Sequence, residues 1–236
     1  MNLKIYTIIC IIIINIIIII DLYPLWLDYK LRYFQKKSHI SNSSLDHNFI
    51  YLDNLMEQSN DFEGHIGCSE LKKKFIDNIL NTYKISNMCE IGFNAGHSAA
   101  LFLNHSSNIK YMLSFDICSH KYSKNCINYI KFLYKERFNI ICGDSKDTVP
   151  NYKGIRFDLI FIDGSHFNNM PFIDIKNTIK YLAKPGSLIL MDDIHYSHLI
   201  SFFFNHTVDK AWNKYINLNI IKPISSIKGL SLGYVV

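Results

Sequence analysis

The sequence has little charge and no block of basic residues. Lys, Arg, Asp and Glu make up 19% of the 236 residues and apolar residues 49%, so the chain can bury a core and lacks the composition of a disordered protein. The formal net charge of +5 comes with no Lys/Arg run interleaved with aromatic residues, which disfavours a nucleic-acid partner. No internal repeat is present, and the length suits one α/β domain with a short appendage.

The sequence also lacks Cys-x-x-Cys pairs, although it contains six cysteines. This absence argues against the common zinc and redox motifs. Cys89 and Cys142 fall in segments that the pattern predicts to be strands, where a buried free thiol is ordinary. We therefore expect all six cysteines to be reduced and structural.

One long apolar run is present, at residues 5–20, with Asn15 as its strongly polar member. A helix rises about 1.5 Å per residue, so this run is slightly short for a hydrocarbon layer of about 30 Å, but residues 22–27 can extend it. No small-residue cleavage site follows, so we predict an uncleaved single-pass membrane anchor over 1–28 rather than a cleaved signal peptide. Positive residues are more numerous after the run, which favours a cytoplasmic domain.

The rest of the chain divides into a linker with a lead-in helix, residues 29–62, and one domain, residues 63–236. From Ser69 onward, short apolar runs alternate with amphipathic segments. This alternation predicts a doubly wound, mainly parallel α/β sheet. The expected parallel strands are 87–91, 111–115, 138–142, 157–162 and 187–191. Two further strand-like runs, 215–221 and 230–236, have no helix between them and predict a C-terminal antiparallel hairpin.

Each expected parallel strand ends in or beside an acid. In an open α/β sheet, ligands bind beyond the carboxyl ends of the strands. A buried carboxylate costs stability unless a ligand or hydrogen bond compensates it. The repeated pattern therefore predicts a binding site at this edge. Its acids are Glu90, Asp116, Asp144, Asp163, Asp192 and Asp193.

The first of these acids opens the loop Glu90-Ile91-Gly92-Phe93-Asn94-Ala95-Gly96. Gly92 allows a tight turn, and Gly96 lets the backbone approach a ligand at the start of the next helix. A dinucleotide loop needs glycine where this chain has Asn94 and His97, so NAD is disfavoured. Asp116 follows Gly92 at about the distance expected of a ribose-binding acid.

With these motifs, the sequence resembles the catechol O-methyltransferase-like branch of the class I S-adenosylmethionine-dependent methyltransferases and the related macrocin-type sugar O-methyltransferases. The resemblance spans roughly residues 63–195 and rests on residues 90–99, 143–150, 157–166 and 191–193. It implies a Rossmann-like domain with S-adenosylmethionine as cofactor. The implied cofactor-binding residues are Glu90, Gly92 and Ser98 at the methionine moiety, Asp116 at the ribose, and Asp144 and Ser145 at the adenine, with Gly96 giving the backbone room to approach the ligand.

The resemblance also implies a divalent cation, usually Mg²⁺, because Asp163, Asp192 and Asp193 match its ligand positions in this branch. Carboxylate oxygens are the ligands that Mg²⁺ prefers. His166 matches the position of the general base, a role that suits a neutral imidazole, so Asp163 and His166 are the expected catalytic residues. In the plainest reading, Asp163 only caps a helix and His166 lies at the surface.

We therefore expect a metal-assisted O-methyltransferase acting on a small-molecule or sugar hydroxyl, whose pKa the metal would lower. The expected partners are a small-molecule or glycan substrate and, through the anchor, a membrane. Two alternatives stay open. One is a metal-independent methyltransferase in which Asp192 and Asp193 only shape the pocket, and the other is an anchored scaffold protein that has lost turnover.

Overall fold

A computed structural model of the chain describes residues 44–59, 65–66, 69–105, 107–194 and 207–236. The chain divides into two compact units, residues 1–42 and 43–236, and the described residues all belong to the second. The predicted domain boundaries after residues 28 and 62 stay a prediction.

The expected membrane localisation has to be corrected. Among the described residues, no helix is long and apolar enough to cross a bilayer. The helix α3, Ser44–Ser59, has 16 residues, whereas a spanning helix needs about 20 that are mostly apolar. The predicted anchor itself, residues 1–28, lies outside the described residues.

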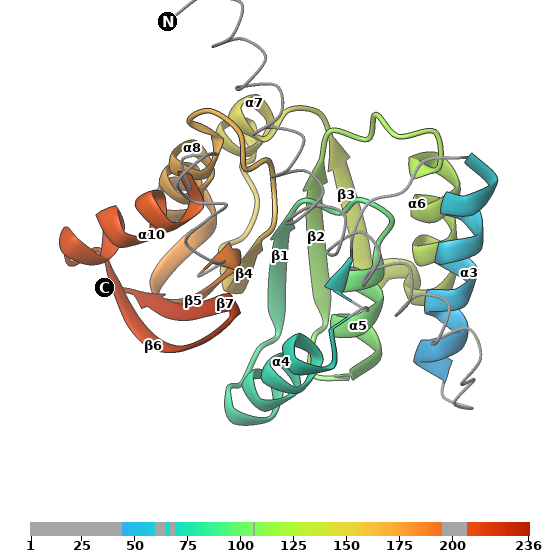
Figure 1. Cartoon of the computed structure of the whole chain (residues 1–236), viewed down its shortest axis with the longest axis horizontal. Coiled ribbons are helices and arrows are strands. Elements are labelled where there is room, and N and C mark those ends of the chain that lie inside the picture. The colour runs from blue at the N-terminus through green and yellow to red at the C-terminus, as the bar shows by residue number, and fades with distance from the viewer. Residues whose placement is uncertain (1–43, 60–64, 67–68, 106, 195–206) are drawn as a thin grey trace, which may run out of the picture. The chain divides into compact units, whose positions relative to one another are not determined.

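Seven strands form one sheet in the order β3-β2-β1-β4-β5-β7-β6 (Figure 1). β1 to β5 are parallel, and β7 runs antiparallel between β5 and β6. The predicted sheet, mainly parallel with a C-terminal antiparallel hairpin, is therefore confirmed. The strands are β1 Asn87–Ile91, β2 Tyr111–Asp116, β3 Phe138–Cys142, β4 Phe157–Ile162, β5 Ala183–Ile194, β6 Ile221–Ile227 and β7 Gly229–Val235.

Helices cover both faces of this sheet (Figure 1). Consecutive residues of a strand point to opposite faces, so Phe161 of β4 packs in one core and Ile160 in the other. Phe102 lies 5.5 Å from Phe161 between ring centroids. The Phe161 side carries α3, α4 Glu70–Thr82, α5 His97–His105 and α6 Ser123–Tyr134, and the Ile160 side carries α7 Ser145–Asn151, α8 Met170–Asn177 and α10 Thr207–Asn217. A 3₁₀ turn, Lys135–Arg137, precedes β3, and a π-helical turn, Thr178–Leu182, follows α8.

The local sequence at the start of α4 fixes where this helix begins. Ser69 is the N-cap, and its hydroxyl accepts the backbone N–H of Lys72 at 3.2 Å. This bond satisfies one of the donors that a helix leaves unpaired at its first turn. Ile76, Ile79 and Leu80 are buried at helical spacing.

The C-terminal region differs from the sequence-based prediction in its boundaries. The run 215–221 was expected to be a strand, but α10 ends at Asn217 and β6 begins at Ile221. Val208, Ala211, Trp212 and Tyr215 are buried in α10, and that spacing is typical of an amphipathic helix. The predicted strand was therefore wrong over most of its length: it covers the last apolar residues of α10 and only the first residue of β6.

The ends of β1, β2 and β4 lie very close together, at the point where the strand order reverses. The N–H of Gly92 donates to the carbonyl of Phe115 at 2.8 Å, and the N–H of Asp163 donates to the carbonyl of Ile91 at 2.8 Å. Gly92 has φ +96°, and a Cβ added there would lie 2.0 Å from the carbonyl oxygen of Asp163. Glycine is therefore required at position 92.

A Gly92→Ala substitution should lower the free energy of unfolding by about 3 kcal/mol or more, because positive φ and a backbone collision act together. Gly186→Ala is the matched control: its φ is +84°, but no atom lies within 4 Å of the added Cβ. The control should lose only about 1–2 kcal/mol from backbone strain. Urea unfolding of both variants measures this, and equal losses would show that the approach to Asp163 is unimportant.

Candidate active site

Glu90 is the last residue but one of β1, immediately before the turn at Gly92. Its side chain is fully buried, and it accepts hydrogen bonds from the hydroxyls of Ser98 and Ser114, the latter at 2.6 Å. Burial raises the pKa of Glu90 to about 7, although both serine hydrogen bonds act to lower it. The residue predicted to hold the methionine moiety is thus poised to change its charge near neutral pH.

Asp116 joins the end of β2 to the glycine loop, residues 90–96. Its Oδ2 accepts the backbone N–H groups of Phe93 and Asn94, both at 2.9 Å, and its Oδ1 accepts the N–H of Cys118 at 2.6 Å. The side chain is half-buried. The structure therefore brings the predicted ribose-binding acid against the predicted methionine-binding loop. Its carboxylate holds the backbone of that loop and the backbone just after β2.

Asp144 and Ser145 follow β3 and begin α7. Asp144 is the N-cap, and its Oδ1 accepts the N–H of Lys146 at 3.0 Å while its Oδ2 accepts the Lys146 ammonium at 2.8 Å. These contacts lower the pKa of Asp144. Ser145 faces the other way and donates its hydroxyl to Asp174 at 2.6 Å. The two residues predicted at the adenine thus have different surroundings.

Asp174 is a site residue that the sequence analysis missed. It lies on α8 with 1% of its surface exposed, and burial raises its pKa to about 6. A Cβ added to Gly164 would lie 2.8 Å from its Oδ2, so the carboxyl group also contacts the loop after β4. The signal in the sequence was an acid between Ile173 and Ile175, where an apolar residue would be ordinary.

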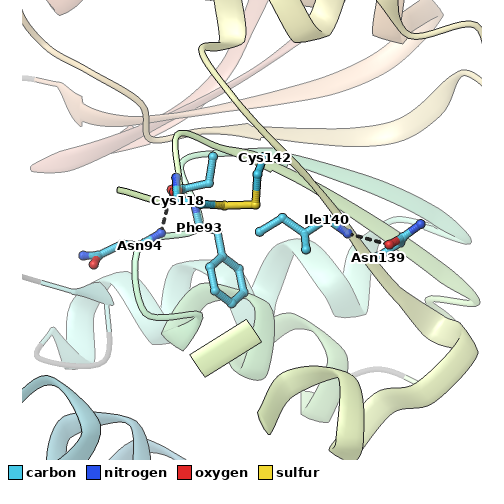
Figure 2. Close-up of a disulfide and its surroundings, with 7 residues drawn as sticks. Phe93, Asn94, Cys118, Asn139, Ile140 and Cys142 are labelled. Carbon is cyan, nitrogen blue, oxygen red and sulfur yellow. Dashed lines mark hydrogen bonds between the residues drawn. A yellow bond between two sulfur atoms is a disulfide. The ribbon is translucent and has the colours of Figure 1, made fainter. Parts of the chain in front are cut away.

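A disulfide between Cys118 and Cys142 contradicts the expectation that all cysteines are reduced. Asp116 and Cys142 are register partners on β2 and β3, so the chain just after each strand end can approach its neighbour, and the two Cα atoms are 5.5 Å apart. Figure 2 shows the bridge beside Phe93 and Asn94 of the glycine loop. A pairing across neighbouring parallel strands has no signature in sequence spacing.

The other described cysteines, Cys89 and Cys126, are buried free thiols as predicted. Cys10 and Cys68 lie outside the described residues. Burial raises the pKa of Cys126 to about 12 and that of Cys89 well above its usual value. Both thiols are therefore unreactive, which supports a packing role for them.

At the ends of β4 and β5, Asp163, His166 and Asp193 form a group that we call the strand-end cluster. One potential ligand atom from each lies within 4.8 Å of the others, and His166 Nε2 is 3.2 Å from Asp193 Oδ2. Asp193 has φ +55°, a backbone conformation that costs about 1–3 kcal/mol and is often found at functional sites. His166 is exposed and Asp163 half-buried.

Asp192, the remaining predicted metal ligand, has a different partner. The buried Lys72 of α4 donates its ammonium group to Asp192 Oδ1 and lies 3.5 Å from Asp193 Oδ1. Burial raises the pKa of Asp192 to about 6, against the opposing effect of Lys72. Burial also raises the pKa of Asp163 strongly, as do the neighbouring charges of Asp192 and Asp193.

The sequence analysis did not identify Lys72 as a site residue. Lys72 belongs to the run Lys72-Lys73-Lys74, which resembles an ordinary solvated helix face. Only the packing of α4 separates Lys72, which is buried, from Lys73 and Lys74, which are more exposed.

Residues 89–194 match the model of a family described as a methyltransferase domain. No curated protein matches the sequence. Among solved structures, the chain is similar to an O-methyltransferase from Bacillus cereus bound to SAH (18% identity, TM-score 0.61, covering 88% of this chain and 97% of that one). It is also similar to TomG from Streptomyces achromogenes bound to SAM, an O-methyltransferase of tomaymycin synthesis (12%, 0.61, 87% and 96%), and to the SAH-bound methyltransferase PaMTH1 from Podospora anserina (16%, 0.58, 88% and 94%).

The sheet order, with its reversal between β1 and β4, defines a Rossmann-like fold. The family match is more specific, because it spans β1 to β5 and includes all of the predicted site residues. Residues 89–194 therefore form a methyltransferase domain, as the sequence resemblance predicted. The roles assigned to individual residues stay predictions.

Replacing Glu90 by Gln should change how stability depends on pH. An acid whose folded-state pKa is raised from 4.5 to about 7 stabilises the fold below pH 4.5, and this contribution is lost as the pH rises through 7. In wild type, this costs about 3 kcal/mol of folding stability as the pH rises, at roughly 1.4 kcal/mol per pKa unit. The Glu90→Gln variant cannot ionise there and should not show this loss. Unfolding at pH 4.5 and 8 tests this: parallel curves for the variant and wild type would contradict it.

Breaking the disulfide should loosen both loops that it joins. Its ends are 24 residues apart, and closing a loop of that size stabilises a fold by about 3 kcal/mol. Reduction should lower the free energy of unfolding by about this amount and weaken the binding of S-adenosylmethionine. The same reductant should have no effect on a Cys118→Ser/Cys142→Ser variant, and an equal effect on that variant would show that another group is responsible.

Proposed function

We propose that this protein transfers the methyl group of S-adenosylmethionine to a hydroxyl group of a small molecule or sugar. The observation that carries the proposal is the strand-end cluster of Asp163, His166 and Asp193, beside the glycine loop. The similar proteins named as O-methyltransferases, TomG and the Bacillus cereus enzyme, support transfer to oxygen.

The close contact of Gly92 with Asp163 supports this geometry. In the proposal, the glycine loop holds the methyl donor, and the loop after β4 holds the acceptor hydroxyl. Fixing donor and acceptor in line removes much of the entropic barrier of a reaction between two molecules. A rigid contact between the two loops is therefore useful to the chemistry, since a shift of either would misalign the reacting atoms.

The donor set fits a divalent cation. Asp163, Asp192 and Asp193 bring three carboxyl groups together, whereas Lys72 supplies one ammonium group. The raised pKa of Asp163 has neighbouring acids among its causes, and a dication would compensate this excess of negative charge. Asp163 and Asp193 would hold it with hard oxygen atoms. When bound, it would lower the pKa of the acceptor hydroxyl.

Methyl transfer also requires a base that removes the proton of the acceptor hydroxyl, and we assign this role to His166. Its Nε2 is 3.2 Å from Asp193 Oδ2. When Nε2 carries a hydrogen and donates it to Asp193, Nδ1 is the basic nitrogen and can accept the proton. Asp193 then stabilises the resulting imidazolium, as a carboxylate does for other catalytic histidines. Because Nε2 carries a hydrogen and Nδ1 receives the proton, His166 is the base in this proposal and is not a ligand of the cation.

A metal-independent version is favoured by one specific observation, the contact of Lys72 with Asp192 and Asp193. In this version the Lys72 ammonium supplies the positive charge of the acidic site. His166 and Asp193 would then remove the proton alone. The two versions predict opposite responses to a chelator.

The test uses the full chain, calorimetry with S-adenosylmethionine, and the formation of S-adenosylhomocysteine with catechol and simple glycosides as acceptors. His166→Ala should lower turnover by about 10²–10⁴-fold, the usual contribution of a general base, with unchanged cofactor affinity. Asp163→Asn and Asp193→Asn should lower turnover and its response to Mg²⁺. Asp158→Asn is the control, because Asp158 lies at the start of β4, at the other end of the strand from Asp163, where it accepts the Lys184 ammonium at 2.7 Å.

Each version has its own failure. If S-adenosylmethionine does not bind, the proposed reaction is wrong. Turnover that survives EDTA and Asp163→Asn but is lost in Lys72→Met would reject the cation and favour the metal-independent version. Cofactor binding without turnover on any acceptor would favour the scaffold alternative.

A further inference from the structure

A second group of potential ligands lies at the start of α5, apart from the strand-end cluster. Asp53 of α3, His65 in the segment before α4 and His97 of α5 meet there, and we call them the histidine cluster. Asp53 Oδ1 is 2.9 Å from His65 Nε2 and 3.0 Å from His97 Nε2. These three residues come from three separate segments, so only the fold brings them together.

The two imidazole rings of the histidine cluster are nearly parallel. Their centroids are 3.5 Å apart with an interplanar angle of 13°, and both direct Nε2 toward the same carboxylate oxygen. Ligand atoms at about 2.0–2.1 Å from one ion lie roughly 3.0–3.3 Å from each other at tetrahedral or octahedral angles. The measured nitrogen–oxygen distances are close to this range, so these donors can share a single ion.

The surroundings of the histidine cluster are largely closed to solvent. The exposed fractions of the side chains are 1% for His97, 5% for His65 and 13% for Asp53. Phe49 packs against both imidazole rings, with centroids 5.3 Å from His97 and 6.2 Å from His65. A carboxylate in such a place needs a positive partner, because burial without one costs several kcal/mol in typical proteins.

We infer that Asp53, His65 and His97 form a binding site for a divalent transition metal, and that Zn²⁺ is the ion they fit best. Two imidazole nitrogens and one carboxylate oxygen are a frequent zinc ligand set, with water in the remaining position. The nitrogen donors distinguish this site from the oxygen-rich strand-end cluster, because Mg²⁺ prefers oxygen ligands. The histidine cluster is therefore a separate site with a different metal preference.

The position of His97 gives this metal a structural consequence. His97 is the first residue of α5, between Gly96 and Ser98, which are both predicted to bind the cofactor, whereas Asp53 and His65 belong to segments that precede α4. A metal bound to all three would fasten α3 and the segment before α4 to the glycine loop. We expect it to raise thermal stability, because a ligand that binds only the folded state stabilises that state.

The experiment measures zinc in the full chain, purified without a polyhistidine tag, loaded with ZnCl₂ and passed over a desalting column. Wild type should retain one zinc per chain, and its melting temperature should rise on loading. His65→Gln and Asp53→Asn should retain less than a tenth as much. Co²⁺ loading gives a second readout, since the visible absorption of a cobalt–imidazole site should appear in wild type and be absent from these two variants.

Two controls make the result specific. His105→Gln removes the histidine of another His–Asp pair, in which Nε2 is 3.1 Å from Asp77, and should keep its zinc. Asp193→Asn alters the strand-end cluster and should also keep it. Circular dichroism must show that each variant is folded. If the variant at Asp53 or the variant at His65 does not fold, the conclusion is drawn from the one that does.

The inference is overturned if wild type retains no zinc, if folded His65→Gln and Asp53→Asn retain as much as wild type, or if only Asp193→Asn loses it. The first outcome would leave a hydrogen-bonded His–Asp–His group, and the last would assign the metal to the strand-end cluster. None of these results depends on turnover, so the failure of this inference is distinct from that of the proposed methyl transfer.

Discussion

The contact between the backbones of Gly92 and Asp163 is the constraint on which the rest of the site depends. It occurs where the strand order reverses, and hydrogen bonds from Gly92 to Phe115 and from Asp163 to Ile91 fix it on both sides. Because the glycine loop and the loop after β4 touch there, the predicted cofactor residues and the strand-end cluster belong to one rigid region. Enzymes benefit from such rigidity, since misalignment of reacting groups by about 1 Å can be costly.

The second constraint is the excess of buried acidic groups over basic groups near the strand ends. Glu90, Asp163, Asp174 and Asp192 all have a raised pKa whose first cause is burial. Lys72 compensates only part of this negative charge, at Asp192 and Asp193. Raised pKa values that cluster in this way are typical of functional sites, where ligands complete the charge balance.

The sequence predicted the features that depend on local pattern. The strands at 87–91, 138–142 and 157–162 agree with the structure. What it could not predict depends on register and packing: the pairing of Cys118 with Cys142 and the burial of Lys72. Neither leaves a periodic signal, because partners on neighbouring elements can lie at any separation along the chain.

The buried carboxyl group of Glu90 can take up or release a proton within the predicted cofactor site. Burial raises its pKa from 4.5 to about 7, so the group changes its protonation near neutral pH. A ligand that brings a positive charge to Glu90 favours the ionised carboxylate, and the displaced proton passes to the buffer. The heat measured for such binding then includes the ionisation heat of that buffer, so an enthalpy for this site has meaning only for a stated buffer.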